Sequence, residues 1–439
     1  MSRYNMFLTN EEKEILMGGK GETLRKAMES VVKYGEIFGA KRLVPINGPV
    51  HLVTSFGVTI LKPVFNIMDE LIENGYKTAK PFTVNPRPLD YKNIKCSILE
   101  KIVFKIMYGK QKQYEKQLEK VGLKDKNAYT CAAYFKEVGN IPKQGDILSW
   151  AESSAVVYAN SVLGARTNRN SGVIELLSGI IGKTPEFGFI TDEGRKASFV
   201  IELKTTKLPS PQVLGSAIGL KVIEDVPYIL NLDKFLGEGL TSKTKDYLKD
   251  MGAASASNGA VGLYHVSNIT PEAVQMGKSL LKENYETYII DDAEIKRVLD
   301  SYPVLWKDLN GKPDFCFVGC PHLSIDQLKL WIDNISMKLK LHKKSKVGVY
   351  TILCTPPDVF VEFEKDEAYV LKLKEIGAHV TSICPLMYMN NPICAKHNVI
   401  TNSNKLRTYT TARYFEDEKM LKLIAGESMK EVISYEEGV

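Results

Sequence analysis

Hydrophobic positions alternate between two spacings in the C-terminal third of the chain, and this alternation predicts an α/β fold. Short apolar runs bounded by turn residues are typical of buried strands, and apolar residues three and four positions apart are typical of helices. These patterns predict strands at 314–319, 347–353, 378–383 and 398–401, and helices at 325–339 and 359–376. Because strands that alternate with helices form βαβ units, we expect a mostly parallel sheet here.

The N-terminal part shows the same alternation over a shorter stretch. Apolar residues at helical spacing predict a helix over 24–38, which Gly39 would close. A strand over 42–46, a helix over 63–73 and a strand over 77–84 follow. We expect these three elements to form one βαβ unit.

Two stretches of the chain have a biased composition, and two local signals mark the starts of helices. Residues 253–266 are rich in small side chains, which fits either a tightly packed helix or a backbone that approaches a ligand. The lysine-rich stretch 105–126 fits the solvent-exposed face of a helix. Capping-box spacing marks the starts of two helices, at Thr9 with Glu12 and at Ser324 with Gln327.

Charge and composition exclude several classes of protein. The net charge of +6 is spread along 439 residues, so we expect no nucleic acid partner. The longest run of low charge, 153–165, is too short to span a bilayer, and we expect no membrane partner. The N-terminus has no apolar signal segment. Seven cysteines, an odd number, favour reduced thiols and a cytoplasmic location.

Three cysteines share a position that favours a common site. Cys320 and Cys384 each precede a proline just after a predicted strand, and Cys131 precedes a loop. In parallel sheets, ligands bind beyond the carboxyl ends of the strands. Three thiolates would suit an iron–sulfur centre or an iron site with one open position, although cysteines are also common in protein cores. Cys316, on the same predicted strand as Cys320, would lie roughly 13 Å away from it and is not expected to be a ligand.

The segment 127–172 adds polar groups to this picture. Arg166 and Arg169 would share a face if the segment is helical, and could grip an anion or form surface ion pairs. Glu152 and Ser153 could take part in proton transfer, or simply begin a helix. Elsewhere, His322 fits a packing role better than a functional one. Lys405, after the last predicted strand, could lie at the same mouth as the cysteines.

Several segments between about residue 6 and at least residue 405 have a distinctive sequence: EEKEILMGGKGETLRKAMESVVKYGEIFGAKRLVPI, PFTVNPRPLD, WAESSAVVYANSVLGARTNRN, IIGKTPEFGFITDEGRKA, NGAVGLYHVSNITPE, VGCPHLS and TNSNK. Together they resemble the aconitase X family of iron-dependent dehydratases. The resemblance implies an aconitase-like α/β fold, with several βα domains and mostly parallel sheets around a metal-containing cleft.

The resemblance also implies roles for individual residues. The metal ligands would be Cys131, Cys320 and Cys384, holding an iron–sulfur cluster (4Fe-4S or 2Fe-2S) or a mononuclear iron. We divide the chain into 1–125 with substrate loops, 126–300 with Cys131 and the central motifs, and 301–439 with the remaining ligands. Substrate contacts would fall on Val53, Thr54, Ser55, Asn85, Pro86, Glu152, Ser153 and Lys405, with Arg166 and Arg169 as further anion-binding residues.

The resemblance predicts a hydro-lyase that acts on a small hydroxy acid. Family members resemble aconitase in having a small swivelling domain with a catalytic serine, which we expect on a separate small subunit. The slightly preferred substrate is cis-3-hydroxy-L-proline, and the alternative is mevalonate 5-phosphate. Two rival hypotheses are a non-enzymatic iron-responsive binding protein, which would need a coherent basic face, and a structural zinc protein, which would normally need four ligands.

Overall fold

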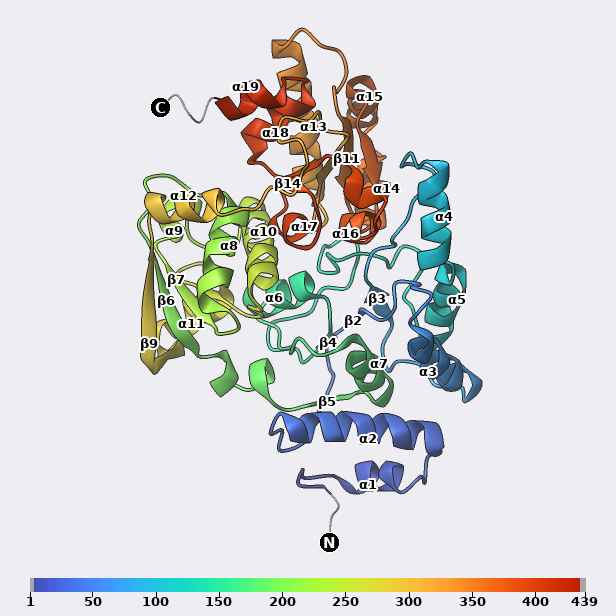
Figure 1. Cartoon of the computed structure of the whole chain (residues 1–439). Coiled ribbons are helices and arrows are strands. Elements are labelled where there is room, and N and C mark those ends of the chain that lie inside the picture. Colours follow the sequence, from blue (N-terminus) through green and yellow to red (C-terminus); the bar gives the residue numbers. More distant parts are fainter. Residues whose placement is uncertain (1–3, 435–439) are drawn as a thin grey trace.

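The computed structural model describes residues 4–434, in which three separate parallel sheets each have helices of their own (Figure 1). The first sheet has the order β3-β2-β4, with β2 at Val50–Leu52, β3 at Phe82–Val84 and β4 at Ser149–Trp150. It is covered by α3 (Lys62–Glu73), α5 (Gln111–Val121) and α7 (Gly172–Ile181). These helices are amphipathic, and their apolar faces, such as Tyr114, Leu118 and Val121 of α5, are buried against the sheet.

The N-terminal βαβ unit is formed by other strands than the pattern predicted. The strand predicted at 42–46 is β1 (Leu43–Pro45), but it pairs antiparallel with β5 (Lys183–Pro185). The parallel partner of β3 is β2, which the hydrophobic pattern did not show. A capping box at Thr9 opens α1 (Asn10–Leu16) as predicted. The predicted helix at 24–38 is α2 (Glu22–Ile37), and the lysine-rich stretch is divided between α4 (Ile98–Met107) and α5.

The second sheet, in the order β8-β7-β6-β9, is also parallel. Its strands are β6 (Ala197–Leu203), β7 (Pro227–Leu230), β8 (His265–Val266) and β9 (Leu281–Ile290). The helices of this region are α6 (Ser153–Ser161), α8 (Pro211–Val222), α9 (Asp233–Leu236), α10 (Ser242–Asn258), α11 (Pro271–Met276) and α12 (Asp292–Asp300).

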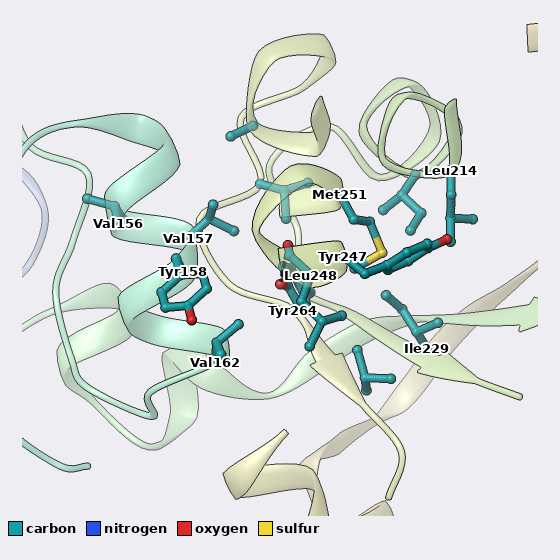
Figure 2. Packing of buried hydrophobic residues seen from close by; sticks show 14 of the residues in the cluster. Val156, Val157, Tyr158, Val162, Leu214, Ile229, Tyr247, Leu248, Met251 and Tyr264 are labelled. Carbon is teal, nitrogen blue, oxygen red and sulfur yellow. Dashed lines mark hydrogen bonds between the residues drawn. The ribbon is translucent and has the colours of Figure 1, made fainter. Parts of the chain in front are cut away.

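The small residues of α10 serve close packing of helices. An added Cβ at Gly215 of α8 would lie only 2.1 Å from the carbonyl oxygen of Met251, so the two backbones nearly touch. Figure 2 shows the side chains packed around α10, among them Val157 and Tyr158 of α6 with Leu248 and Met251 of α10. Of the two interpretations of 253–266, a tightly packed helix therefore holds as far as residue 258.

The third sheet, in the order β12-β11-β10-β13-β14, is parallel throughout, as the sequence predicted. Its strands are β10 (Phe315–Val318), β11 (Tyr350–Cys354), β12 (His379–Thr381), β13 (Val399–Thr401) and β14 (Arg413–Tyr414). Its helices are α13 (Ile325–Leu341), α14 (Pro357–Phe363), α15 (Glu367–Ile376), α16 (Pro385–Met389), α17 (Asn404–Tyr409), α18 (Asp417–Ile424) and α19 (Met429–Ser434).

Two details of this third region test the helix predictions. The capping box of Ser324 and Gln327 opens α13 as predicted. The single helix predicted over 359–376 is wrong, because the segment forms α14 and α15 with a break between them. Asp366 lies in the break, where its side chain accepts a hydrogen bond from the N–H of Tyr369 and starts the second helix.

The remaining regular elements within residues 4–434 are short 3₁₀ helices. No helix within residues 4–434 has both the length and the apolar character that crossing a membrane requires. The 3₁₀ helices lie at Gly188–Ile190, Glu193–Arg195, Gly277–Leu280 and Cys394–Lys396.

Candidate active site

A small pocket of about 60 Å³ lies where the first and third sheets meet α6 and α17. Among the residues that line it are the three cysteines singled out from the sequence, together with Glu152 and Lys405. The structure therefore brings together five residues that lie up to 274 positions apart in the chain, between Cys131 and Lys405. Its other lining residues are Phe56, Pro86, Ser154, Gly319, Pro321, His322, Pro385, Leu386 and Met387.

Each cysteine lies just beyond the carboxyl end of a parallel strand. Cys320 follows β10, and Cys384 lies between β12 and α16, of which it is the N-cap residue. Cys131 comes directly after Thr130, whose N–H donates to the carbonyl of Val84 at the end of β3 (2.8 Å). The strand ends thus position the three thiols around one pocket, as the general rule for parallel sheets leads one to expect.

The thiols form a donor set that suits an iron–sulfur cluster. Thiolates are soft ligands, and clusters of iron and sulfide are held by them. Burial raises the pKa of Cys131 to about 12, with Glu152 contributing, and burial likewise raises the pKa of Cys320 and of Cys384. Within residues 4–434, no three His, Cys, Asp or Glu side chains converge so as to hold a single metal ion.

The other cysteines of the third sheet lie outside the pocket lining. Cys316 is fully buried in the hydrophobic cluster beneath α13, on the other side of β10 from the pocket cluster that contains Cys320. Cys354, at the end of β11, is also fully buried and lies close enough to the three pocket thiols for their charges to raise its pKa further, after burial, which is the main cause. No pattern in the sequence indicates that Cys354 lies so near.

An ion pair crosses the pocket between α6 and α17. The ammonium of Lys405, in the first turn of α17, lies 3.0 Å from Oε1 of Glu152, the N-cap residue of α6. Lys405 also donates to Oγ of Ser153 (3.4 Å). Burial is the largest single influence on both groups and disfavours their charges, but several attractions together outweigh it. Lys405, His51 and Arg169 hold the pKa of Glu152 below its usual value, and Glu152 with the three cysteines raises the pKa of Lys405. Both groups are therefore charged at neutral pH.

The loop after β2 and the end of β3 contribute the remaining residues of the predicted substrate side. Of this set, Pro86 lines the pocket, together with Phe56, which the sequence analysis missed. Thr54 is hydrogen bonded through its hydroxyl to the hydroxyl of Tyr114 (2.7 Å). Ser55 and Asn85 are buried beside the pocket wall, and Val53 is partly exposed next to them.

The structure separates the two arginines that the sequence placed on one helix face. Residues 162–171 are not helical, and Arg166 bridges to Ile147 as an isolated strand-like pair. The guanidinium of Arg166 is bound to Asp192 and to the carbonyl of Ile190. Arg169 is exposed and donates to the carbonyl of Ala256 (3.3 Å). It is near enough to Glu152 for its charge to help lower the pKa of that carboxyl.

Comparison with known families accounts for this arrangement. Models of the aconitase X first, second and third domains match residues 5–193, 197–300 and 313–424. The chain belongs to the aconitase X family. Each sheet described above lies within the residues matched by one of these domain models, so the family predicted from the sequence and its α/β fold are both confirmed.

Relatives within the aconitase X family are named dehydratases. A phosphomevalonate dehydratase large subunit from Thermococcus kodakarensis is 35% identical over 341 residues, covering 76% of this chain and 78% of the relative. A cis-3-hydroxy-L-proline dehydratase from Hypocrea jecorina is 27% identical over 73% of this chain, which spans 52% of that enzyme. These names confirm the predicted hydro-lyase class.

A solved structure of the family shows the same fold. The holo-form of Thermococcus kodakaraensis aconitase X has a TM-score of 0.77 to this chain at 29% identity, and the match covers 95% of this chain and 99% of that one. A holo-form agrees with a bound cofactor in this aconitase-like family.

Proposed function

We propose that this chain is the large subunit of a dehydratase that acts on mevalonate 5-phosphate. The observation that carries the proposal is the ranking of its relatives. Those named phosphomevalonate dehydratase large subunit are 31–35% identical to the chain, and those named cis-3-hydroxy-L-proline dehydratase are 24–27% identical. The slight preference for 3-hydroxyproline in the sequence analysis is therefore replaced by its alternative.

An exposed cationic donor near the pocket supports this substrate. Mevalonate 5-phosphate carries a carboxylate and a phosphate, so it needs more positive charge than 3-hydroxyproline does. Lys405 is already paired with Glu152, and Arg166 is paired with Asp192. Arg169 is exposed, has a neutral carbonyl as its partner and lies near Glu152. A guanidinium of this kind suits a phosphate, which it can bind through two parallel hydrogen bonds.

The proposed reaction removes water across two adjacent carbons. A C–OH bond and a C–H bond break, a carbon–carbon double bond forms, and water leaves. Cys131, Cys320 and Cys384 would hold an iron–sulfur cluster, which when bound supplies a Lewis acid for the departing hydroxyl. Lys405 keeps Glu152 ionised, so that this carboxylate can receive or position a proton at the pocket, with Ser153 beside it.

The carbon-bound proton calls for a further base. We assign it to a serine of a small partner subunit, a role implied by the resemblance to aconitase and supported by the name "large subunit" among the relatives. The residues of this chain would then bind the substrate, hold the metal and control the charge of Glu152, and the partner would complete the site.

The substrate assignment is tested with the chain and its partner together, using mevalonate 5-phosphate and cis-3-hydroxy-L-proline. Turnover of the first compound is expected. Arg169→Ala should raise KM for mevalonate 5-phosphate by about ten- to a hundredfold, because a charge-assisted hydrogen bond contributes roughly 1.5–3 kcal/mol. Arg42→Ala is the matched control, since Arg42 is an exposed arginine paired with Glu186, the residue after β5. If the enzyme turns over cis-3-hydroxy-L-proline but not mevalonate 5-phosphate, the substrate assignment is wrong.

The metal assignment is tested by changing one cysteine at a time in anaerobically purified protein. Cys131→Ser, Cys320→Ser and Cys384→Ser should each abolish the visible absorption of an iron–sulfur cluster. Cys316→Ser should leave it unchanged, because Cys316 is buried in the cluster beneath α13. Absorption that survives Cys384→Ser would contradict the set of three ligands.

A further inference from the structure

His322 lies at the meeting point of all three cysteine segments. Its side chain is completely buried, two residues after Cys320 and against the pocket. Its Nδ1 lies 3.1 Å from Oγ1 of Thr130, the neighbour of Cys131. Its Nε2 lies 3.0 Å from the carbonyl oxygen of Ile383, the neighbour of Cys384. The imidazole thus connects three segments, which are those of Cys131, of Cys384 and of Cys320, to which His322 itself belongs.

The chemistry of these partners shows how the ring is held. A backbone carbonyl can only accept, so Nε2 must carry a hydrogen and donate to Ile383. The hydroxyl of Thr130, which accepts a hydrogen bond from the N–H of Ala132 (2.9 Å), is the partner of the other ring nitrogen, Nδ1. Both ring nitrogens are therefore engaged, and the ring is held from both sides.

The backbone of His322 adds two more connections. Its N–H donates to Sγ of Cys131 (3.4 Å), which is a direct hydrogen bond to one of the proposed metal ligands. Its carbonyl accepts from the ammonium of Lys249 on α10 (2.9 Å), and that ammonium is buried and also bound to Gln327. Lys249 lies in the second family domain, Thr130 in the first and His322 in the third.

We propose that His322 is a positioning residue for the metal centre, which holds the three cysteine segments together around the pocket. The inference rests on the proposed function, because it needs Cys131, Cys320 and Cys384 to be the metal ligands. His322 acts through other residues and has no part in bond making or breaking. Groups that hold and orient metal ligands in this way commonly change metal affinity about 10- to 100-fold when they are replaced.

The test compares two buried histidines. His322→Gln keeps a donor that can reach Ile383 but loses the rigid ring that joins Ile383 to Thr130. His265→Gln is the matched control, because His265 is equally buried and its Nε2 also binds a backbone carbonyl, that of Arg195 (2.8 Å), in the second sheet. Both proteins are purified anaerobically with iron bound. The rate of iron loss to a colorimetric chelator is then measured, with the melting temperature alongside.

The expected result is that His322→Gln loses iron at least tenfold faster than wild type, whereas His265→Gln loses it at the wild-type rate even if its melting temperature falls as far. Thr130→Val should also release iron faster, and Thr130→Ser, which keeps the hydroxyl, should restore the wild-type rate.

Two other outcomes would overturn the inference in distinguishable ways. If wild-type protein binds iron and His322→Gln releases it no faster than His265→Gln, the positioning role is wrong while the metal assignment stands. If wild-type protein binds no iron at all, the proposed metal centre fails, and the role of His322 fails with it.

Discussion

The ion pair of Lys405 and Glu152 sets the charge of the pocket. Their side chains are only 15% and 11% exposed. If one partner were removed, little water could therefore solvate the charge of the other. Removing one member of such a buried pair commonly costs about 3–5 kcal/mol, because an uncompensated charge is left behind. Lys405→Met should therefore lower the free energy of unfolding by an amount of this order and drive Glu152 to take up a proton.

A double-mutant cycle measured by urea unfolding checks this prediction. Lys405→Met combined with Glu152→Gln should be clearly more stable than the sum of the two single changes implies, since no charge is left unpaired. Additive losses would mean that the two groups do not interact in solution. Activity is expected to fall in all three variants, with Glu152→Gln lowering kcat.

The position of a single side chain could be predicted from the sequence only where the residue lies next to a helix or strand. Cys320 and Cys384 follow strands, so strand ends alone placed them at one edge of the sheet. Arg166 lies in an irregular segment, where hydrophobic periodicity carries no information about direction. Its ion pair with Asp192 depends on how two loops pack, which no local pattern records.

The first turn of α7 supports the loop that follows β2. A Cβ placed on Gly172 would lie 1.5 Å from the carbonyl oxygen of Val53, so this position must be glycine for the loop to lie where it does. Gly172→Ala should displace residues 53–55 and raise KM for substrate at least several-fold. The control is Gly179→Ala on the same helix, where the nearest atom would be Cγ2 of Thr78 at 3.3 Å. Equal KM values for the two variants would show that the loop does not contact the substrate.

The same helix carries a buried carboxyl that makes stability depend on pH. Burial is the main cause that raises the pKa of Glu175 to about 8, although hydrogen bonds from Ser149 and Asn170 act in the opposite direction. The folded protein therefore keeps this proton up to about pH 8, whereas the unfolded chain releases it above its ordinary value of 4.5. Since the unfolded state binds fewer protons in this range, stability is lost as pH rises from 4.5 to about 8.

Glu175→Gln isolates this effect, because the amide cannot titrate. Relative to the variant, wild type should lose up to about 1.4 kcal/mol of unfolding free energy for each pH unit between those two values. Urea unfolding of both proteins at pH 5 and pH 7.5 measures the difference. A difference that does not change with pH would show that Glu175 titrates normally in the folded protein.

Elements were predictable where the pattern was long enough to be periodic. The capping boxes at Thr9 and Ser324 are local signals that need only three residues of context, and both formed. The strands β2 and β4 have three and two residues, too few for any periodicity, and the sequence analysis missed them. The break after α14 was missed because apolar residues continue at helical spacing on both sides of it.

The arrangement of the site follows from parallel strands of the first and third sheets that end at one pocket. The first and third sheets contribute the cysteines, and the second contributes α10, whose Lys249 binds the carbonyl of His322. Two strands that lie about a hundred residues apart, β2 and β4, pair in the first sheet. Long-range pairing of this kind cannot be inferred from one sequence, and the domain limits at residues 125 and 300 stay predictions.

The dependence on a small partner is the prediction that concerns the whole molecule. The phosphomevalonate dehydratase relatives are named large subunits, and a large subunit implies a small one. The chain alone, loaded with iron, should show no dehydratase activity on mevalonate 5-phosphate. Activity should appear when the small subunit is added and should saturate at equal molar amounts. Replacing the proposed serine of that subunit by alanine should abolish turnover but leave the binding of the two chains intact.

Full turnover by the isolated chain would mean that its own residues supply the base. Glu152→Gln in the isolated chain would then test the first residue to suspect, because its ionised carboxylate already lines the pocket.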